Sequence, residues 1–298
     1  MLKLFAEQIG ILNFFIRGFQ IKFLKKFKKK IVYKLITQNE YNIHKWDPSG
    51  TEIFMTQCFS DWGNEYLFLD SIKKRHNGCF IDVGCHSGYF PSLFKNYFQK
   101  IIGFEPSKKC TDILKELNND KFSCYQYFVG NKNMNVTGKE SDAGYSFYND
   151  NNQSNQTLTQ NLTQITLDSF CNEKKIEKIT GIKIDVDGID FEVLEGAREI
   201  IKINRPSILI ENYSQELFNY FKDLNYSLFS IVSIKSKPFN LFLEELNHYD
   251  SHKWIKMVCC IPNEFKKNYE KTFFKGNIFT GINKRKIIDF FEIKLNKD

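Results

Sequence analysis

The chain has 298 residues, which is enough length to bury one large core or two modest ones. Hydrophobic residues make up 42% of it and charged residues 26%, a globular composition that excludes a disordered chain. The formal charge of +7 is concentrated in residues 1–38, where nine basic side chains face one acid, whereas the remaining residues sum to −1, so no nucleic-acid partner is expected for the body.

Residues 1–38 are predicted to form a basic amphipathic helical arm. Their longest uncharged run, Gln8 to Ile16, is shorter than the roughly 20 apolar residues that span a bilayer. We expect the arm to pack on the body or on a second copy in a homo-oligomer, with peripheral contact to the inner membrane face as the alternative. The apolar residues recur every three or four positions, as on one side of a helix: Phe5, Ile9, Leu12, Ile16, Phe19, Phe23, Phe27, Ile31 and Leu35.

The eight cysteines form no Cys-x-x-Cys pair, which argues against a zinc ribbon or a redox motif. Scattered cysteines without a recognisable signal peptide predict reduced thiols and a cytoplasmic protein.

From residue 79 onward, short apolar runs alternate with helical segments. Strands are predicted at 79–83, 101–105, 182–186 and 207–211, and helices at 89–98, 108–117 and 191–201. This alternation indicates βαβ units, hence an α/β protein with a mainly parallel sheet and helices on both faces. Residues 226–234 and 254–261 are predicted to be two later strands, as in a hairpin that closes such a sheet.

A glycine loop follows the first of these strands, with the pattern Asp82-x-Gly84-x-x-x-Gly88. The glycines permit a tight turn and a close approach of a ligand to the backbone. Glu105 ends the next strand, 21 residues after Gly84, where an acid can accept hydrogen bonds from both hydroxyls of a ribose. The alternative is an ordinary turn with a surface glutamate.

A second cluster of charges lies in the strand at 182–186 and just after it. Lys183 and Asp185 alternate with isoleucines, so both project from the same face and should be paired or functional. Asp185 and Asp187 stand at the carboxyl end of the strand, where open α/β sheets bind ligands. The alternative is an Asp-Gly turn before a helix whose first turn is acidic.

Five motifs in this order resemble the FkbM family of S-adenosylmethionine-dependent O-methyltransferases. The resemblance implies a Rossmann-like class I methyltransferase with a mainly parallel, seven-stranded sheet. It implies methyl transfer to a hydroxyl of a sugar, polysaccharide, glycolipid or related metabolite. The motifs are Asp-Val-Gly-x-x-x-Gly-Tyr-Phe from residue 82, Gly-Phe-Glu-Pro at 103–106, Ile-Thr-Leu-Asp-Ser-Phe at 165–170, Lys-Ile-Asp-Val-Asp-Gly with Val-Leu-Glu-Gly-Ala within 183–197, and Arg-Pro-Ser-Ile-Leu-Ile-Glu at 205–211.

The resemblance covers about residues 76–262 and sets the expected domain layout. The arm at 1–38 and a helical or loop lead-in at 39–75 precede the methyltransferase domain at 76–262, and a basic C-terminal tail follows at 263–298.

The site residues follow from matching these motifs. Asp82, Gly84, Gly88 and Glu105 correspond to the residues that bind S-adenosylmethionine. The candidate bases that would take the hydroxyl proton are Asp185, Asp187, Glu211 and His86. Asp187 and Asp190 stand where similar sequences usually have glutamate.

We expect no metal site, although the oxygens of Asp185 and Asp187 are of the type that Mg²⁺ prefers. The expected partner is a small-molecule or glycan acceptor. A methyltransferase fold that binds without turnover is one alternative. A nucleic-acid methyltransferase is a weaker one, because Asp-Val-Asp-Gly stands where such enzymes usually have a proline-rich tetrapeptide. The glycine spacing disfavours an NAD-dependent dehydrogenase.

Overall fold

The computed structural model describes residues 9–57, 59–72, 75, 78–141, 144–147, 159–234 and 237–266. The chain divides into two compact units. We call residues 77–91 and 98–206 the parallel unit, and residues 1–76, 92–97 and 207–298 the antiparallel unit. The predicted methyltransferase domain at 76–262 has residues in both units. Most of the predicted C-terminal tail lies outside the described residues.

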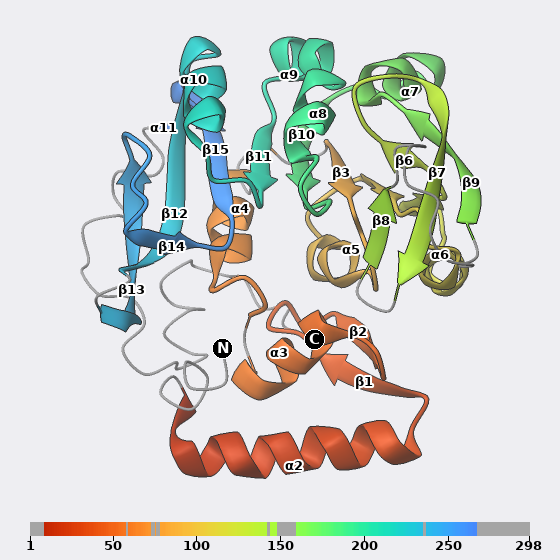
Figure 1. Ribbon diagram of the computed structural model, residues 1–298, viewed down its shortest axis with the longest axis vertical. Coiled ribbons are helices and arrows are strands. Elements are labelled where there is room, and N and C mark those ends of the chain that lie inside the picture. Colours follow the sequence, from red (N-terminus) through yellow and green to blue (C-terminus); the bar gives the residue numbers. More distant parts are fainter. Residues whose placement is uncertain are drawn as a thin grey trace. The chain divides into compact units, whose positions relative to one another are not determined.

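Four parallel strands form the main sheet of the parallel unit, in the order β10-β3-β4-β5. Figure 1 shows β10 and β3 of this sheet. The α/β class predicted from the sequence is confirmed. Nearly every strand residue is buried in β3, β4 and β10, which explains their continuous apolar runs. The strands are β3 (Cys79–Val83), β4 (Lys100–Phe104), β5 (Phe122–Tyr125) and β10 (Ile179–Ile184).

The remaining elements of this unit are a small second sheet and four helices. The small sheet has the order β6-β9-β7-β8 and consists of β6 (Phe128–Val129), β7 (Met134–Ser141), β8 (Gly144–Phe147) and β9 (Thr159–Ile165). The helices are α6 (Lys108–Lys115), α7 (Leu167–Glu173), α8 (Asp190–Glu195) and α9 (Arg198–Asn204).

The single helix predicted over 191–201 is wrong, because α8 ends and α9 begins within that range. The interruption includes Gly196, where the backbone passes very close to Gly130. A Cβ on Gly196 would lie 2.1 Å from the carbonyl oxygen of Gly130. The helix predicted over 89–98 is shorter than expected, since α5 (Tyr89–Phe94) ends four residues earlier.

The antiparallel unit contains strands in the order β11-β15-β12-β13, with β14 also paired to β12. The first predicted late strand is confirmed as β12, but the second, predicted over 254–261, is divided into two strands, β14 and β15, which both pair antiparallel with β12. The strands are β11 (Ser207–Ile210), β12 (Tyr226–Ile234), β13 (Lys237–Leu246), β14 (Lys253–Ile255) and β15 (Val258–Pro262). Three of the helices in this unit are α4 (Asn64–Ile72), α10 (Gln215–Asp223) and α11 (Asn263–Lys266).

The family resemblance implies a main sheet of seven strands, whereas the main sheet in the described residues has nine. The difference arises because β13 and the short β14 both pair with β12.

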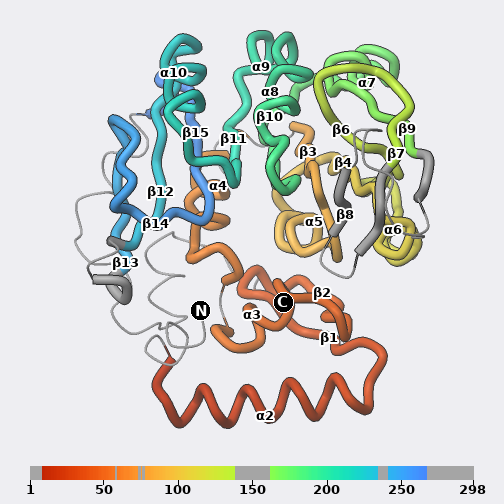
Figure 2. Tube along the Cα trace, viewed as in Figure 1, coloured from red at the N-terminus to blue at the C-terminus, as the bar shows by residue number. Residues whose placement is uncertain are grey.

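The N-terminal arm is a helix followed by a hairpin, so the continuous helix predicted for it is wrong. Helix α2 (Ile11–Phe27) ends before β1 (Lys30–Lys34), which pairs with β2 (Glu40–His44) (Figure 2). Ile31 is buried opposite Ile43 in this hairpin. The β-branched and aromatic residues of β1 favour a strand once a partner strand is available.

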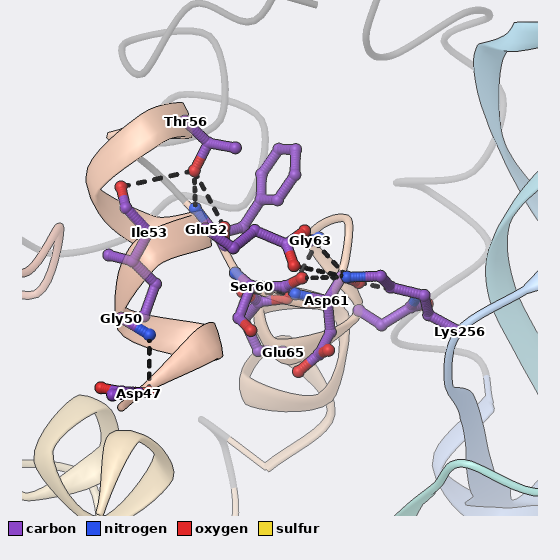
Figure 3. A network of polar contacts seen from close by, with 12 residues as sticks. Asp47, Gly50, Glu52, Ile53, Thr56, Ser60, Asp61, Gly63, Glu65 and Lys256 are labelled. Carbon is purple, nitrogen blue, oxygen red and sulfur yellow. Dashed lines mark hydrogen bonds and ion pairs between the residues drawn. The ribbon is translucent and has the colours of Figure 1, made fainter. Parts of the chain in front are cut away.

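A network of polar contacts joins α3 (Pro48–Thr56) to the turns before α4 and before β15 (Figure 3). The Nζ of Lys256 donates to both carboxylate oxygens of Glu52, each at 2.8 Å, and to the carbonyl oxygen of Ser60 at 2.6 Å. Burial raises the pKa of Glu52 to about 7, although Lys256 opposes the rise. Glu65 accepts from the backbone N–H of Ser60 at 2.8 Å and of Gly63 at 3.1 Å.

Candidate active site

The glycine loop joins β3 to α5 through backbone conformations that favour glycine. Gly84 has φ 77° and Gly88 has φ 82°, and between them His86 also has a positive φ of 44°. The N–H of Gly84 donates to the carbonyl oxygen of Phe104 at 2.9 Å. A Cβ on Gly84 would lie 1.9 Å from the carbonyl oxygen of Asp185, so the glycine lets the two segments meet.

Gly84→Ala is therefore expected to lower the free energy of unfolding by about 3 kcal/mol, because backbone strain and a backbone clash add. Gly188→Ala is the matched control. It introduces a side chain at a similar φ of 98° but with no atom within 4 Å, so it should cost only about 1 kcal/mol. Urea unfolding of both variants measures the difference. Equal losses would show that the close approach to Asp185 contributes nothing.

Glu105 lies directly after β4 and ties the glycine loop to the segment that follows. One carboxylate oxygen accepts from the N–H of His86 at 2.9 Å, and the other accepts from the N–H of Ser107 at 2.9 Å. The residue is only 7% exposed, so the alternative of a surface glutamate is wrong. Burial raises the pKa of Glu105 to about 7, and the two N–H donors oppose that rise.

A buried ammonium group joins the first and second charged clusters. The Nζ of Lys183 lies 3.5 Å from a carboxylate oxygen of Asp82, 3.2 Å from one of Asp185 and 2.7 Å from the carbonyl oxygen of Gly84. The strand register places Lys183 opposite Asp82, and both side chains are buried. The expectation that the charges in this strand are paired is confirmed.

Asp82 is fully buried, and neither carboxylate oxygen accepts a hydrogen bond from the described residues. Burial raises the pKa of Asp82 to about 6, while the charge of Lys183 acts in the opposite direction. In this position Asp82 compensates Lys183, and a direct contact with a cofactor stays a prediction. The sequence predicts that Lys183 is paired or functional, because it is a charge inside an apolar strand, but Lys183 is not among the predicted site residues.

The acids after β10 differ in exposure. Asp185 has a side chain that is 38% exposed at the carboxyl end of the strand, and Asp187 is exposed in the turn that follows, with φ 49°. Asp190 begins α8 and accepts from the N–H of Val186 at 3.3 Å. The Asp-Gly turn and the acidic first turn of the helix, which the alternative interpretation of this cluster predicted, are therefore both present. Asp185 precedes both and belongs to neither.

Three of the four candidate bases lie in the parallel unit. His86 is half-buried in the glycine loop, near the end of β3, and the two aspartates Asp185 and Asp187 follow β10. Because β3, β4 and β10 run parallel, their carboxyl ends lie at one edge of this sheet. Glu211 is exposed directly after β11 in the antiparallel unit. Within the described residues, no group of three or more His, Cys, Asp or Glu side chains is arranged to hold a metal ion.

The family comparison agrees with this site. A family model described as the methyltransferase FkbM domain matches residues 82–229, from Asp82 at the end of β3 into β12. No curated protein matches the chain.

Several solved structures are similar to parts of the chain. Methyltransferase FkbM from Methylobacillus flagellatus KT has 14% identity and a TM-score of 0.41 over 82% of this chain and 59% of that one. A precorrin-6y C5,15-methyltransferase from Geobacter metallireducens GS-15 has 10% identity and a TM-score of 0.36 over 66% and 84%. TrmK from M. capricolum, in complex with S-adenosyl-homocysteine, has 16% identity and a TM-score of 0.33 over 65% and 67%.

This chain spans about three fifths of the length of the FkbM protein from Methylobacillus flagellatus KT. Because the TM-scores lie below 0.5, the fold assignment stands on the chain's own strands. These give an α/β, class I methyltransferase-like fold with a mixed, mostly parallel central sheet. Residues 82–229 match the family model of the methyltransferase FkbM domain, so the chain contains an FkbM-type methyltransferase domain.

Proposed function

We propose that the protein transfers a methyl group from S-adenosylmethionine to a hydroxyl oxygen of a sugar, polysaccharide, glycolipid or related metabolite. The observation that carries the proposal is the half-exposed carboxylate of Asp185. It stands at the carboxyl end of β10, bound to the buried Lys183, where the glycine loop meets its backbone. A hydroxyl oxygen needs a base as it becomes methylated, and this carboxylate is accessible to take the proton.

The residues at this edge fit S-adenosylmethionine. Each carboxylate oxygen of Glu105 accepts one backbone N–H and has a second lone pair to offer a ribose hydroxyl. Acids outnumber the one buried ammonium group of Lys183 here, which suits the positive sulfonium and amino groups of the cofactor. Tyr125 is the last residue of β5, the strand next to β4, and Tyr127 lies two residues further along. Their rings are nearly parallel, with centroids 6.3 Å apart, and offer an aromatic surface on which adenine would stack.

When bound, S-adenosylmethionine supplies an electrophilic methyl group. The chain must then hold the acceptor oxygen in line with that methyl and accept its proton. Asp185 is our first candidate for the base, and Lys183 fixes its carboxylate. Asp187 and His86 are the alternatives in the same unit, and Glu211 is the alternative in the other.

The choice of acceptor rests on the family and on charge. The residues after 38 sum to −1, which gives no electrostatic attraction for a polyphosphate backbone. Asp-Val-Asp-Gly after β10 also lacks the prolines of the nucleic-acid enzymes. Both observations favour a neutral hydroxyl compound.

Binding of S-adenosylmethionine tests the cofactor assignment. Glu105→Ala should weaken the affinity by about 1–3 kcal/mol, because ribose hydroxyls lose a charged acceptor. The affinity of the unmodified protein should rise with pH through about 7, as Glu105 loses its proton. Calorimetry at pH 6 and pH 8 measures both effects, and Glu116→Ala, an exposed glutamate of the same unit, is the control. Absence of binding by the unmodified protein contradicts the assignment.

Transfer of a labelled methyl group tests the reaction. We expect label from S-adenosylmethionine to appear in extracted glycans or glycolipids, and not in DNA or RNA incubated in parallel. Binding of the cofactor without label in any acceptor would instead favour a module that binds without turnover.

A further inference from the structure

Helix α2 presents a face of large apolar side chains, interspersed with Lys22 and Lys26, that no described residue covers. Seven large side chains of the helix are each between 46% and 74% exposed, although helices of this composition normally bury such residues. At about 100° per residue they occupy one half of the helix circumference. They are Ile11, Leu12, Phe15, Ile16, Phe19, Phe23 and Phe27. We call them the α2 face.

The opposite side of α2 is fixed to α3 within the same antiparallel unit. Arg17 donates to the carbonyl oxygen of Met55 at 2.6 Å, and Lys25 donates to the hydroxyl of Thr51 at 2.6 Å. Ile21, on the same side, is 3% exposed. The α2 face is therefore held outward by specific contacts to α3, so the part of the predicted stripe that lies in α2 does not pack on the body, whereas Ile31 and Leu35 further along the stripe are buried.

Positive charge accompanies the α2 face among the described residues. Helix α2 contains no acidic residue. Lys22 and Lys26 each stand one position before a phenylalanine of the face, and the Nζ of Lys26 lies 5.8 Å from the ring centre of Phe27. Three further exposed lysines follow the helix at 28–30.

We propose that α2 binds flat to the surface of an anionic lipid bilayer. The phenylalanines would enter the interface between headgroups and acyl chains, while the lysine stems let the ammonium groups reach lipid phosphates. No helix among the described residues is long and apolar enough to cross a membrane. A bilayer fits better than a second copy of the chain, because a second α2 would bring the same lysines and no acid to pair with them.

The test uses the full-length protein and extruded vesicles of phosphatidylcholine, with or without phosphatidylglycerol at one part in three. We expect co-sedimentation with the anionic vesicles and much weaker binding to the neutral ones. Phe19→Ser with Phe23→Ser should reduce binding about tenfold or more. Lys22→Gln with Lys26→Gln should reduce it several-fold, and raising salt should weaken binding of the unmodified protein.

The matched control is Ile203→Ser, which removes an apolar side chain that is 77% exposed but lies in α9. It should bind vesicles like the unmodified protein. A thermal melt of each variant checks that it is folded. Equal binding by the phenylalanine variant, or no binding of the folded protein to anionic vesicles, overturns the proposal. Self-association that is lost in the same variant, without vesicle binding, assigns the α2 face to a second copy. The outcome is independent of methyl transfer.

Discussion

Lys183→Met is expected to lower the free energy of unfolding by about 3–5 kcal/mol at pH 8, because it leaves the charge of Asp82 buried without its partner. Methionine has a similar length and fills the space, so loss of packing contributes little. Asp82 is fully buried, and its carboxylate accepts no hydrogen bond from the described residues. Among these residues, Lys183 alone therefore compensates the negative charge of Asp82. Urea unfolding measures the effect.

The pH dependence of this loss distinguishes charge from packing. Folding raises the pKa of Asp82 from 3.8 to about 6, so the folded state holds the proton more tightly and stability falls as pH rises through that range. Without the charge of Lys183, the pKa of Asp82 in the folded state rises further, so the pH range over which stability falls extends to higher pH. The loss should therefore be smaller at pH 5 than at pH 8. Adding Asp82→Asn to Lys183→Met should restore part of the stability at pH 8. A loss that is independent of pH, with no recovery in the double variant, would contradict the charge argument.

Asp185→Asn is expected to reduce methyl transfer about a hundredfold or more, because the amide cannot take the hydroxyl proton. The substitution keeps the size of the side chain, and cofactor affinity should be retained. Single-turnover transfer of the labelled methyl group to the acceptor separates this step from binding. Asp112→Asn, an exposed aspartate of α6 paired with Lys108, is the control for the same chemical change.

Parallel variants locate the base if Asp185 is not that group. Asp187→Asn, His86→Gln and Glu211→Gln each remove one of the other candidates. Unchanged turnover in Asp185→Asn would leave this carboxylate only the role of a partner for Lys183. A hundredfold loss confined to one of the other three would move the base to that residue.

The central strands could be predicted because their sequences are continuous apolar runs. The predicted ranges at 79–83 and 226–234 coincide with β3 and β12, and the strand at 207–211 differs from β11 by one residue. The glycine loop could also be predicted from the sequence, since only glycine readily adopts the φ values found at Gly84 and Gly88.

Other features depend on partners that are distant in sequence. Nothing near Gly196 indicates that the backbone of Gly130 approaches it, so one helix was predicted where two occur. The three-four spacing of Ile31 continues that of α2, but pairing with Ile43 makes it part of a strand. Likewise, the spacing of the sequence predicted that Glu105 lies at the end of its strand. It did not predict the two hydrogen bonds that Glu105 accepts from backbone N–H groups.

The pair of Asp82 and Lys183 also bears on how the parallel sheet assembles. These two residues face each other across β3 and β10, which are separated by about a hundred residues of chain. A slip of one position would set Asp82 opposite Ile182 or Ile184 and turn Lys183 toward the other side of the sheet. Two buried charges would then lose their compensation at once. The pair thus penalises misaligned intermediates during folding and selects one alignment of strands that are otherwise uniformly apolar.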